Sequence, residues 1–367
     1  FITNGRKGEP VFTDRNAKQA YSARVEGVAR KKMDGFLKEQ GIDDSKITHR
    51  YSAAISGFAA KLTKSEAEAL SKNPKVFSVE PDRIVTMQNF WVENVEPAAK
   101  QGVSTIAARQ TTECFVNNAG GAANGSTKDA WIWIIDSGID LDHPDLNVVT
   151  NTSYARSFVG GSANDCNGHG THVAGIAAAI SNSTGIVGIS AGAAVVPVRV
   201  FGCSGGSATS TIVAGINHVA ANDIAGDVAN MSLGGYFGSN CASNSSYRTA
   251  VNSLAGTSKV AIAAGNDAAN ANLYQPGCIS RTNVYTVASM TCSESFSSFS
   301  NYGVGPIDWI ATGSSVRSTY LNGGYATLSG TSMASPVVAG ILHQRNGAPR
   351  QCGTVTRSGV TYKIACR

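Results

Sequence analysis

Residues 131–136 read Trp131-Ile132-Trp133-Ile134-Ile135-Asp136, a run of five apolar residues that ends on a carboxylate. The run has the length of a strand and shows no polar alternation, as expected for a strand that is buried on both faces. Similar features follow along the chain, with apolar runs at 194–200, 228–233 and 260–264 and helical stretches at 171–180 and 209–222. Buried strands that alternate with helices predict an α/β domain, a mainly parallel sheet flanked by helices. Ligands of such sheets bind at the carboxyl ends of the strands.

The chain of 367 residues divides into two parts of different composition. Residues 1–90 hold 16 basic and 11 acidic side chains, whereas residues 91–367 hold 14 of each together with all eight cysteines and 34 of the 40 glycines. This contrast places a domain boundary near residue 90. Charged residues amount to only 15%, and no apolar run reaches the ~18 residues of a membrane-spanning helix. We therefore expect a monomer that acts on neither nucleic acid nor membranes.

The first part reads as a small α+β domain. Apolar residues near the helical period predict a helix over 14–40, and alternating residues predict strands over 47–51 and 57–62. Thr63 with Glu66 three residues later forms a capping box that opens a second helix. Residues 76–81 are predicted to close the domain as a strand.

The cysteines indicate an oxidising compartment. Their number is even and no Cys-x-x-Cys pair occurs, which favours disulfides over metal binding. The first residues, 1–5, lack the basic and apolar regions of a signal peptide. We interpret the chain as one that begins after a removed signal and is secreted.

Two polar residues in glycine-rich turns of the second part suit acid-base chemistry. Asp136 ends the first buried strand, although a carboxylate there could equally cap a turn. His169 lies in Asn167-Gly168-His169-Gly170-Thr171-His172, where the glycines let the backbone turn and leave the imidazole unobstructed. The alternative here is a metal site of His169, His172 and Asp165, against which stands the absence of the His-Glu-x-x-His spacing.

Ser332 is the candidate nucleophile. It lies in Ser329-Gly330-Thr331-Ser332-Met333-Ala334-Ser335-Pro336, directly before the apolar run 337–342. A serine before an apolar helix is ordinarily an N-cap, with Pro336 in the first turn. The same position suits a nucleophile, because the amides of a helix N-terminus stabilise developing negative charge.

In the order Asp136, His169, Ser332, and each within a long matching stretch, these residues resemble the catalytic triad of the subtilisin-like serine proteases, particularly the proteinase K-like branch. The resemblance is close over 131–342 and moderate over 40–90. It implies that Ser332 attacks the scissile carbonyl, that His169 takes its proton and that Asp136 orients the imidazole. Asn266, in Ala263-Ala264-Gly265-Asn266, matches the oxyanion-hole asparagine and would donate together with the Ser332 backbone N–H. No cofactor is implied for catalysis.

The resemblance also implies how substrate is held. Two segments would pair with the substrate backbone, the first with Gly205 and Gly206 and the second with Ser232, Leu233 and Gly234. The pocket for the residue before the cut would be lined by Ala263, Gly265 and Tyr274. We expect a broad preference for apolar or aromatic side chains. Residues 1–90 resemble the family's ferredoxin-like inhibitory propeptide, which also acts as a folding chaperone. Its tail, 76–89, would lie in the substrate site, with cleavage near Asn89 or Phe90.

Weaker parts of the resemblance concern stability. Asp308, with carbonyls of Thr282 and Val284, corresponds to a calcium site of proteinase K-like enzymes, and a solvated surface Asp is the alternative. Cys166 and Cys203 correspond to a disulfide of one branch, and Cys352 with Cys366 could close the chain end. The pairing of the other four cysteines is left open by the sequence. The C-terminal tail, 343–367, departs from the family because it is basic and lacks the expected later helices.

The function expected from this resemblance is that of a secreted serine endopeptidase made as a self-processing zymogen. Two alternatives use the same fold, a catalytically silent binding protein and a peptide ligase. Silent members usually lose a triad residue, and ligases usually change the nucleophile or its pocket. This chain retains Asp136, His169, Ser332 and Asn266, which favours the protease.

Overall fold

The computed structural model describes residues 10–87, 90–97, 110–238, 241 and 245–367. Its centre is a ten-stranded sheet in the order β20-β21-β17-β16-β14-β12-β6-β10-β7, with β8 also paired to β10. The strands are β6 (Ile132–Asp136), β7 (Asn147–Val148), β8 (Arg156–Ser157), β10 (Ala194–Arg199), β12 (Val228–Met231), β14 (Lys259–Ala263), β16 (Val284–Met290), β17 (Ile307–Thr312), β20 (Arg350–Arg357) and β21 (Val360–Cys366). All neighbours are parallel except β20 and β21. The predicted α/β architecture is confirmed.

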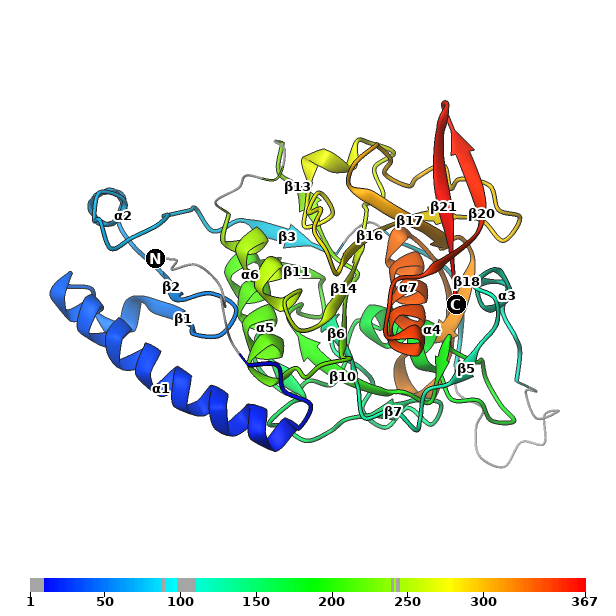
Figure 1. Ribbon diagram of the computed structural model, residues 1–367, viewed down its shortest axis with the longest axis horizontal. Helices are drawn as coiled ribbons and strands as arrows, with labels where there is room; N and C mark the ends of the chain where they lie inside the picture. The colour runs from blue at the N-terminus through cyan, green and yellow to red at the C-terminus, as the bar shows by residue number, and fades with distance from the viewer. Residues whose placement is uncertain (1–9, 88–89, 98–109, 239–240, 242–244) are drawn as a thin grey trace.

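Helices cover both faces of this sheet (Figure 1), with α4 (His169–Ala178) and α7 (Thr331–Arg345) on one side and α5 (Thr209–Asn222) and α6 (Ser246–Leu254) on the other. Strand β6 shows why its sequence has no polar alternation. Ile132 and Ile134 pack in the core on the α4 and α7 side, while Trp133 and Ile135 pack on the α5 side. Both sets are fully buried, so either face of β6 requires apolar residues.

A smaller sheet lies beside α4 and consists of β18 (Val316–Thr319), β19 (Tyr325–Ser329) and β4 (Trp91–Glu96). The remaining short elements of the second part are α3 (Cys114–Asn118), β5 (Ala123–Asn124), β9 (Ser190–Ala191), β11 (Gly206–Ala208), β13 (Gly235–Tyr236) and β15 (Tyr274–Gln275). Strand β19 leads directly into α7, so the small sheet and the start of α7 are positioned together.

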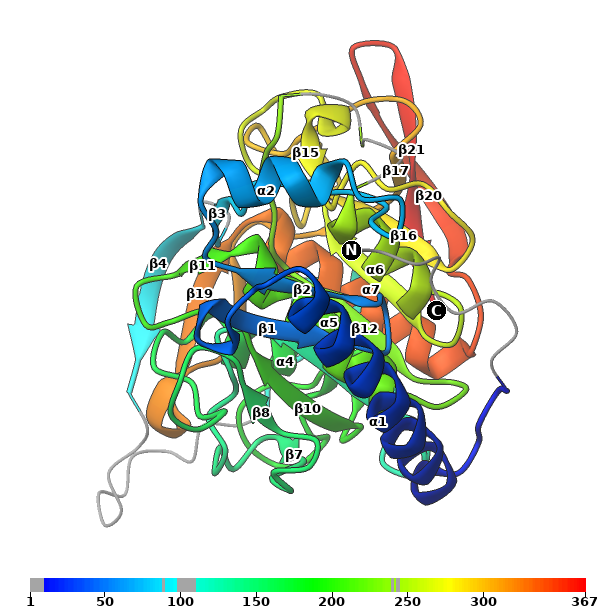
Figure 2. The same ribbon diagram turned by 90° about the vertical axis from the view of Figure 1, so that its left-hand side faces the viewer.

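The first part is the predicted α+β unit, with α1 (Arg15–Glu39), β1 (Ile47–Tyr51), β2 (Gly57–Ala60) and α2 (Lys64–Ser71). The Thr63–Glu66 capping box is present at the start of α2. Figure 2 shows this domain across the outer face of α5 and α6.

The strand predicted over 76–81 is wrong, because these residues form no ladder. Phe77 is 54% exposed, and the segment instead brings carboxylates to two helix N-termini. Glu80 Oε1 accepts a hydrogen bond from Ser246 N at 2.7 Å, and Asp82 Oδ1 accepts one from Ser210 N at 2.9 Å. Negative charge is favourable at these helix ends. The third strand is β3 (Ile84–Thr86), which pairs outside its own domain.

The N-terminal end of α1 is held by two buried ion pairs to carboxylates that follow the C-terminal end of α5. Arg15 binds Asp227 in a bidentate manner, with Nη1–Oδ2 2.8 Å and Nη2–Oδ1 2.7 Å, and its guanidinium lies 3.3 Å from the ring centroid of Trp131. Lys18, only 1% exposed, lies 3.5 Å from the carboxylate of Asp223. The α1 anchor is the name given to the four residues of these two ion pairs, Arg15, Lys18, Asp223 and Asp227.

The C-terminal tail, whose packing the sequence leaves unexplained, forms a hairpin at the edge of the main sheet (Figure 1). Strand β21 lies parallel to β17 with Ile364 opposite Ile310, and both residues are buried. The hairpin thus covers a sheet edge that would otherwise be open. The structure joins Cys352 to Cys366 across the hairpin.

Four disulfides are present, Cys114–Cys292, Cys166–Cys203, Cys241–Cys278 and Cys352–Cys366. They include both pairs expected from the resemblance and resolve the four cysteines left open by the sequence. Among the helices of the described residues, none combines the length and apolar character that a membrane span requires.

Candidate active site

Asp136 and His169 meet at the carboxyl end of the sheet. Asp136 is the last residue of β6, and His169 is the first residue of α4, which follows Gly168. His169 Nδ1 donates to Asp136 Oδ1 at 2.8 Å, and both side chains are fully buried. This bond sets the imidazole tautomer and leaves Nε2 as the nitrogen able to accept a proton.

A neighbouring carboxylate that the sequence suggested only as a metal ligand, Asp165, builds the turn before His169. Its Oδ1 accepts from Asn167 N, Gly168 N and Ser137 Oγ, and its Oδ2 accepts from Thr171 N and Oγ1, all within 2.7–3.0 Å. These bonds fix the start of α4 and therefore the position of the imidazole. Because both of its oxygens accept hydrogen bonds from N–H and O–H groups of this turn, the role of Asp165 is to stabilise the turn.

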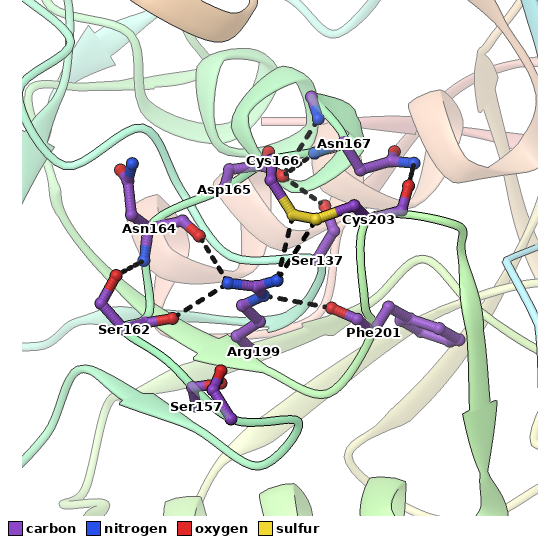
Figure 3. The surroundings of a disulfide bond; sticks show 12 residues. Ser137, Ser157, Ser162, Asn164, Asp165, Cys166, Asn167, Arg199, Phe201 and Cys203 are labelled. Carbon is purple, nitrogen blue, oxygen red and sulfur yellow. Dashed lines mark hydrogen bonds between the residues drawn. A yellow bond between two sulfur atoms is a disulfide. The ribbon is translucent and has the colours of Figure 1, made fainter.

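The disulfide Cys166–Cys203 braces the same turn (Figure 3). It ties the residue after Asp165 to the segment that follows β10, and Asn167 Nδ2 donates to Cys203 O at 2.9 Å. Arg199, at the end of β10, donates to the carbonyls of Ser162 and Asn164 at 3.1 Å and contacts the Cys166 sulfur. The His169 turn is thus fixed to the sheet from two sides.

Ser332 is the second residue of α7 and is fully buried. Pro336 is the sixth residue of α7 rather than part of its first turn, so that prediction is wrong. Since proline has no N–H, the carbonyl of Ser332 cannot receive the usual helical bond from residue 336. Ser232 Oγ donates to this carbonyl at 2.8 Å instead, and Ser332 Oγ in turn donates to Ser232 O at 3.3 Å.

Asn266 lies opposite the start of α7. Its Oδ1 accepts from both Thr331 N and Thr331 Oγ1 at 2.8 Å, which leaves Nδ2 as the donor of the side chain. The loop that carries it depends on Gly265, whose φ is +113° and where a Cβ would lie 2.0 Å from Asn301 Nδ2. Asn301 therefore packs directly under this loop, and it also accepts from Asp267 N at 3.1 Å.

The structure brings the candidate residues of the triad into one buried region but does not form every bond between them. Within the described residues, His169 Nε2 has no hydrogen-bond partner and Ser332 Oγ is directed at Ser232. The ring of Phe90, from the chain itself, lies beside the imidazole, with its centroid 4.7 Å from that of His169. A Cβ at Gly330 would lie 3.7 Å from the Phe90 Cβ, so the segment also passes close to the start of α7.

The residues before Phe90 approach along one predicted substrate strand. Strand β3 pairs antiparallel with β11, with Thr86 opposite Gly206, and Met87 N donates to Gly205 O at 2.8 Å. Gly205 has a φ of +81°, and a Cβ there would lie 2.8 Å from Met87 Cε. The pairing extends beyond the predicted Gly205 and Gly206 to residue 208. Asn89 lies outside the described residues.

The second predicted strand, 232–234, shows no ladder with β3 in the part of the chain that the structure describes. Ser232 is used to hold Ser332, as above, and Leu233 is fully buried. Gly234 precedes β13, and a Cβ at the next residue, Gly235, would lie 3.8 Å from Val85 Cγ1. This segment therefore lies within side-chain reach of β3.

The three residues predicted to line the pocket before the cut belong to β14, the loop that follows it and β15. Ala263 ends β14 and is fully buried, and a Cβ at Gly277 would lie 3.1 Å from its carbonyl. Tyr274 begins β15 and packs on Tyr236 with centroids 5.5 Å apart. Burial and the nearby carboxylate of Asp267 raise the pKa of Tyr274 to about 12. The phenol therefore remains neutral near pH 7.

The metal alternative at His169 finds no support. His172 Nε2 faces the carbonyls of Val316 and Ala326 at 3.1 and 3.0 Å, and burial lowers its pKa to about 3. Of the two other members of this alternative, His169 Nδ1 is bonded to Asp136, and both oxygens of Asp165 already accept from N–H donors. No cluster of three His, Cys, Asp or Glu side chains suited to a metal occurs in the described residues.

Comparison with known proteins identifies both parts of the chain. The model of the subtilase family matches residues 127–348, and that of peptidase inhibitor I9 matches residues 11–88. The chain is 37% identical over 302 residues to alkaline serine exoprotease A of Vibrio alginolyticus, covering 82% of this chain and 53% of that protein. It is 35% identical over 306 residues to the extracellular serine proteinase of Thermus sp. strain Rt41A, covering 83% and 69%.

Among solved structures, a cold-adapted subtilisin-like serine proteinase aligns with a TM-score of 0.51 and 35% identity, covering 61% of this chain and 77% of that one. The chain spans about half the length of the Vibrio relative, so the similarity concerns the shared domains. The family prediction is confirmed. The chain belongs to the subtilase family of serine proteases, with an inhibitor I9 propeptide domain before its catalytic domain.

Proposed function

We propose that this chain is the precursor of a secreted serine endopeptidase that cuts itself near residue 90. The observation that carries the proposal is the position of the Phe90 ring against His169. Strand β3, which precedes Phe90, pairs with the predicted substrate strand β11, and strand β4, which follows Phe90, pairs with β19. The chain's own backbone thus runs through the candidate active site in the manner of a substrate. The division of the chain into residues 1–90 and 91–367 that we propose follows from the same cut.

The reaction would proceed from the side chains already described. Ser332 Oγ rotates from Ser232 O to His169 Nε2, which accepts its proton as Oγ attacks the carbonyl carbon. Asp136 stabilises the imidazolium through the 2.8 Å bond at Nδ1. The Asn266 amide and the Ser332 N–H, in the first turn of α7, donate to the oxyanion. The imidazolium then protonates the leaving amine, and water repeats the sequence to release the acyl group.

The substrate preference that we propose is broad and apolar or aromatic in the pocket of Ala263, Gly265 and Tyr274. Two of these residues are small, and Tyr274 is neutral. The name of the Vibrio relative describes an exoprotease. We favour endopeptidase activity here because β3, Phe90 and β4 pass through the site as continuous chain on both sides of the candidate cut.

The proposal is tested by refolding the unmutated chain and following its mass with time. Appearance of fragments divided near residue 90, with covalent labelling of Ser332 by a serine-directed phosphonate, is expected. An intact and unlabelled chain would support the silent binding protein. Formation of ligated peptides in preference to hydrolysis, with labelling retained, would support the ligase.

Asn266→Ala is expected to lower kcat by about 10²–10³-fold with little change in KM, because an oxyanion donor acts mainly in the transition state. The substitution also leaves Thr331 without its acceptor, so a control is required. Thr331→Val removes the hydroxyl that donates to Asn266 and accepts from Gly265 N at 3.1 Å, but it keeps the amide bond and the Asn266 Nδ2 donor, so its loss in kcat should be smaller. Steady-state kinetics of the matured enzymes would measure both. An equal loss in the two variants would argue against a direct role for Nδ2.

We also propose a structural calcium ion at Asp308, with carbonyls of Thr282 and Val284. Asp308 is half-buried, and its Oδ2 accepts a hydrogen bond from Thr286 N at 2.9 Å. Burial raises the pKa of Asp308 to about 6, so a cation bound there would favour the charged carboxylate, and calcium prefers oxygen ligands.

Without calcium, stability is expected to fall as the pH rises from about 4 to about 6, because the folded state holds the Asp308 proton more tightly than the unfolded chain does. Calcium should remove this fall by stabilising the carboxylate. Urea unfolding of the Ser332→Ala precursor, with EDTA or with calcium, would measure it without self-digestion. Asp308→Asn should abolish both effects. A calcium effect that persists in Asp308→Asn would place the ion elsewhere.

A further inference from the structure

Strand β4 continues the chain beyond Phe90 and pairs antiparallel with β19 over its whole length. Trp91 lies opposite Ser329 and Glu96 opposite Tyr325, with one irregularity between Thr327 and Leu328. Because β4 follows Phe90 directly, its residues occupy the positions of a substrate on the C-terminal side of the cut. Strand β19 is therefore an edge along which that side of a peptide is held by backbone hydrogen bonds.

The side chains of β4 are poorly buried. Trp91, Val92 and Val95 are 45%, 48% and 52% exposed, and the strand adds little to the core. Such a strand is held mainly by its backbone and by a few side-chain contacts, as in peptide recognition by strand addition. A segment held in this way can be replaced by another of different sequence.

Two carboxylates of β4 have polar partners. Glu93 Oε1 accepts a hydrogen bond from Ser329 Oγ, and Glu96 is bound by a basic side chain, Arg317. Glu96 receives three hydrogen bonds from Arg317, with Nε at 3.0 Å from Oε1 and 3.1 Å from Oε2, and Nη2 at 2.8 Å from Oε2. The Arg317 side chain is 19% exposed, and its guanidinium lies 4.7 Å from the ring centroid of Tyr325. Glu113, 3.8 Å away, adds a second negative charge. The stacked guanidinium is thus held in place to bind a carboxylate in a fork.

We propose that β19 and Arg317 form a specificity site for the distal part of substrates, in which Arg317 selects an acidic side chain six residues after the position of Phe90. This inference rests on the proposed peptidase function. It requires β4 to leave after the first cut. Phe90 supports that step, since its ring lies against His169 and would obstruct the imidazole in every later turnover.

The test uses the matured, unmutated enzyme and synthetic peptides with the sequence of residues 84–97. The reference peptide keeps Glu at position 96, and two others carry Gln or Lys there. A fourth exchanges Val95 with Glu96, which preserves composition but turns the carboxylate to the other face of the strand. We expect kcat/KM for the Gln peptide to be roughly three- to tenfold lower than for the reference, as for a partly exposed, bidentate ion pair. The exchanged peptide should behave like the Gln peptide.

Variants of the enzyme then assign the effect to one side chain. In Arg317→Gln the ratio of kcat/KM between the Glu and Gln peptides should approach one, and in Arg317→Glu the Lys peptide should become the best of the series. Arg350→Gln, a matched change at an exposed site on the C-terminal hairpin, should retain the original ratio. If the Arg317 variants fail to mature, the peptide series on the unmutated enzyme still tests whether an acidic side chain is preferred at position 96.

Equal kcat/KM for all four peptides would overturn the proposed specificity site while leaving the peptidase function intact. A preference that persists in Arg317→Gln would also overturn it. Failure of the refolded enzyme to cut any of the peptides would instead overturn the proposed function and the inference that rests on it.

Discussion

Ser332→Ala should yield a precursor that folds and never divides near residue 90. The substitution removes the candidate nucleophile, and loss of a serine nucleophile of this kind lowers kcat by roughly 10⁴–10⁶-fold. Within the described residues, Ser332 Oγ makes one hydrogen bond, of 3.3 Å to Ser232 O, so its removal should change the structure little. Mass spectrometry of the refolded variant over days, beside the unmutated chain over minutes, measures the difference.

A matched control for this experiment is Ser335→Ala, one helical turn further along α7. Ser335 is also fully buried, and its hydroxyl donates to Asn230 Oδ1 at 2.8 Å rather than facing His169. This variant should still divide, although its unfolding free energy should fall by about 1 kcal/mol through loss of one buried hydrogen bond. Division of Ser332→Ala at the normal rate would remove Ser332 from the mechanism.

Asp136→Asn should lower kcat by roughly 10⁴-fold while leaving the fold intact. An amide has the shape of the carboxylate, so packing at the end of β6 is preserved. It lacks the negative charge that stabilises the imidazolium, and its N–H₂ can bond His169 in the wrong tautomer. Both oxygens of Asp136 are buried, and Oδ1 already accepts from Ser137 N at 2.7 Å and from His169 Nδ1.

Steady-state kinetics of matured Asp136→Asn would measure this loss, with protein matured in trans if self-cleavage becomes too slow. Asp140→Asn is the matched control. Its carboxylate lies in the same loop but accepts from Gly323 N at 2.9 Å and makes no contact with His169. That variant should retain most of its activity. A loss of similar size in both variants would indicate that the loop as a whole, and not the Asp136 charge, is responsible.

Features that depend on neighbouring residues could be predicted from the sequence. Strand β6 follows from five consecutive apolar residues, and the start of α2 follows from Thr63 and Glu66 within one turn. These signals lie within a few neighbouring residues, so they can be recognised without knowledge of tertiary contacts. The candidate site is predicted differently, because Asp136, His169 and Ser332, each within a long matching stretch, resemble a known catalytic triad.

Features that join distant segments could not be predicted. The segment 76–81 has the composition of a strand, yet its position is decided by the N-termini of α5 and α6, more than 120 residues later. Arg317 and Glu96 are 221 residues apart, and Cys114 and Cys292 are 178 apart. Asp165 is a candidate metal ligand in the sequence because it lies near His169 and His172. Its actual partners are backbone amides and the hydroxyls of Ser137 and Thr171, which the fold brings to it. Roles of this kind appear only once the fold has brought the segments together.

The α1 anchor changes what a single cut near residue 90 can achieve. Cleavage there breaks neither the β3–β11 ladder nor the bonds of Arg15 to Asp227, which engage opposite ends of the released fragment. The fragment becomes a bivalent ligand, and while one end is bound the other rebinds at a high effective concentration. We therefore expect dissociation to be slow until a second cut separates the two ends. The anchor thereby makes the lifetime of inhibition depend on how fast the fragment itself is degraded.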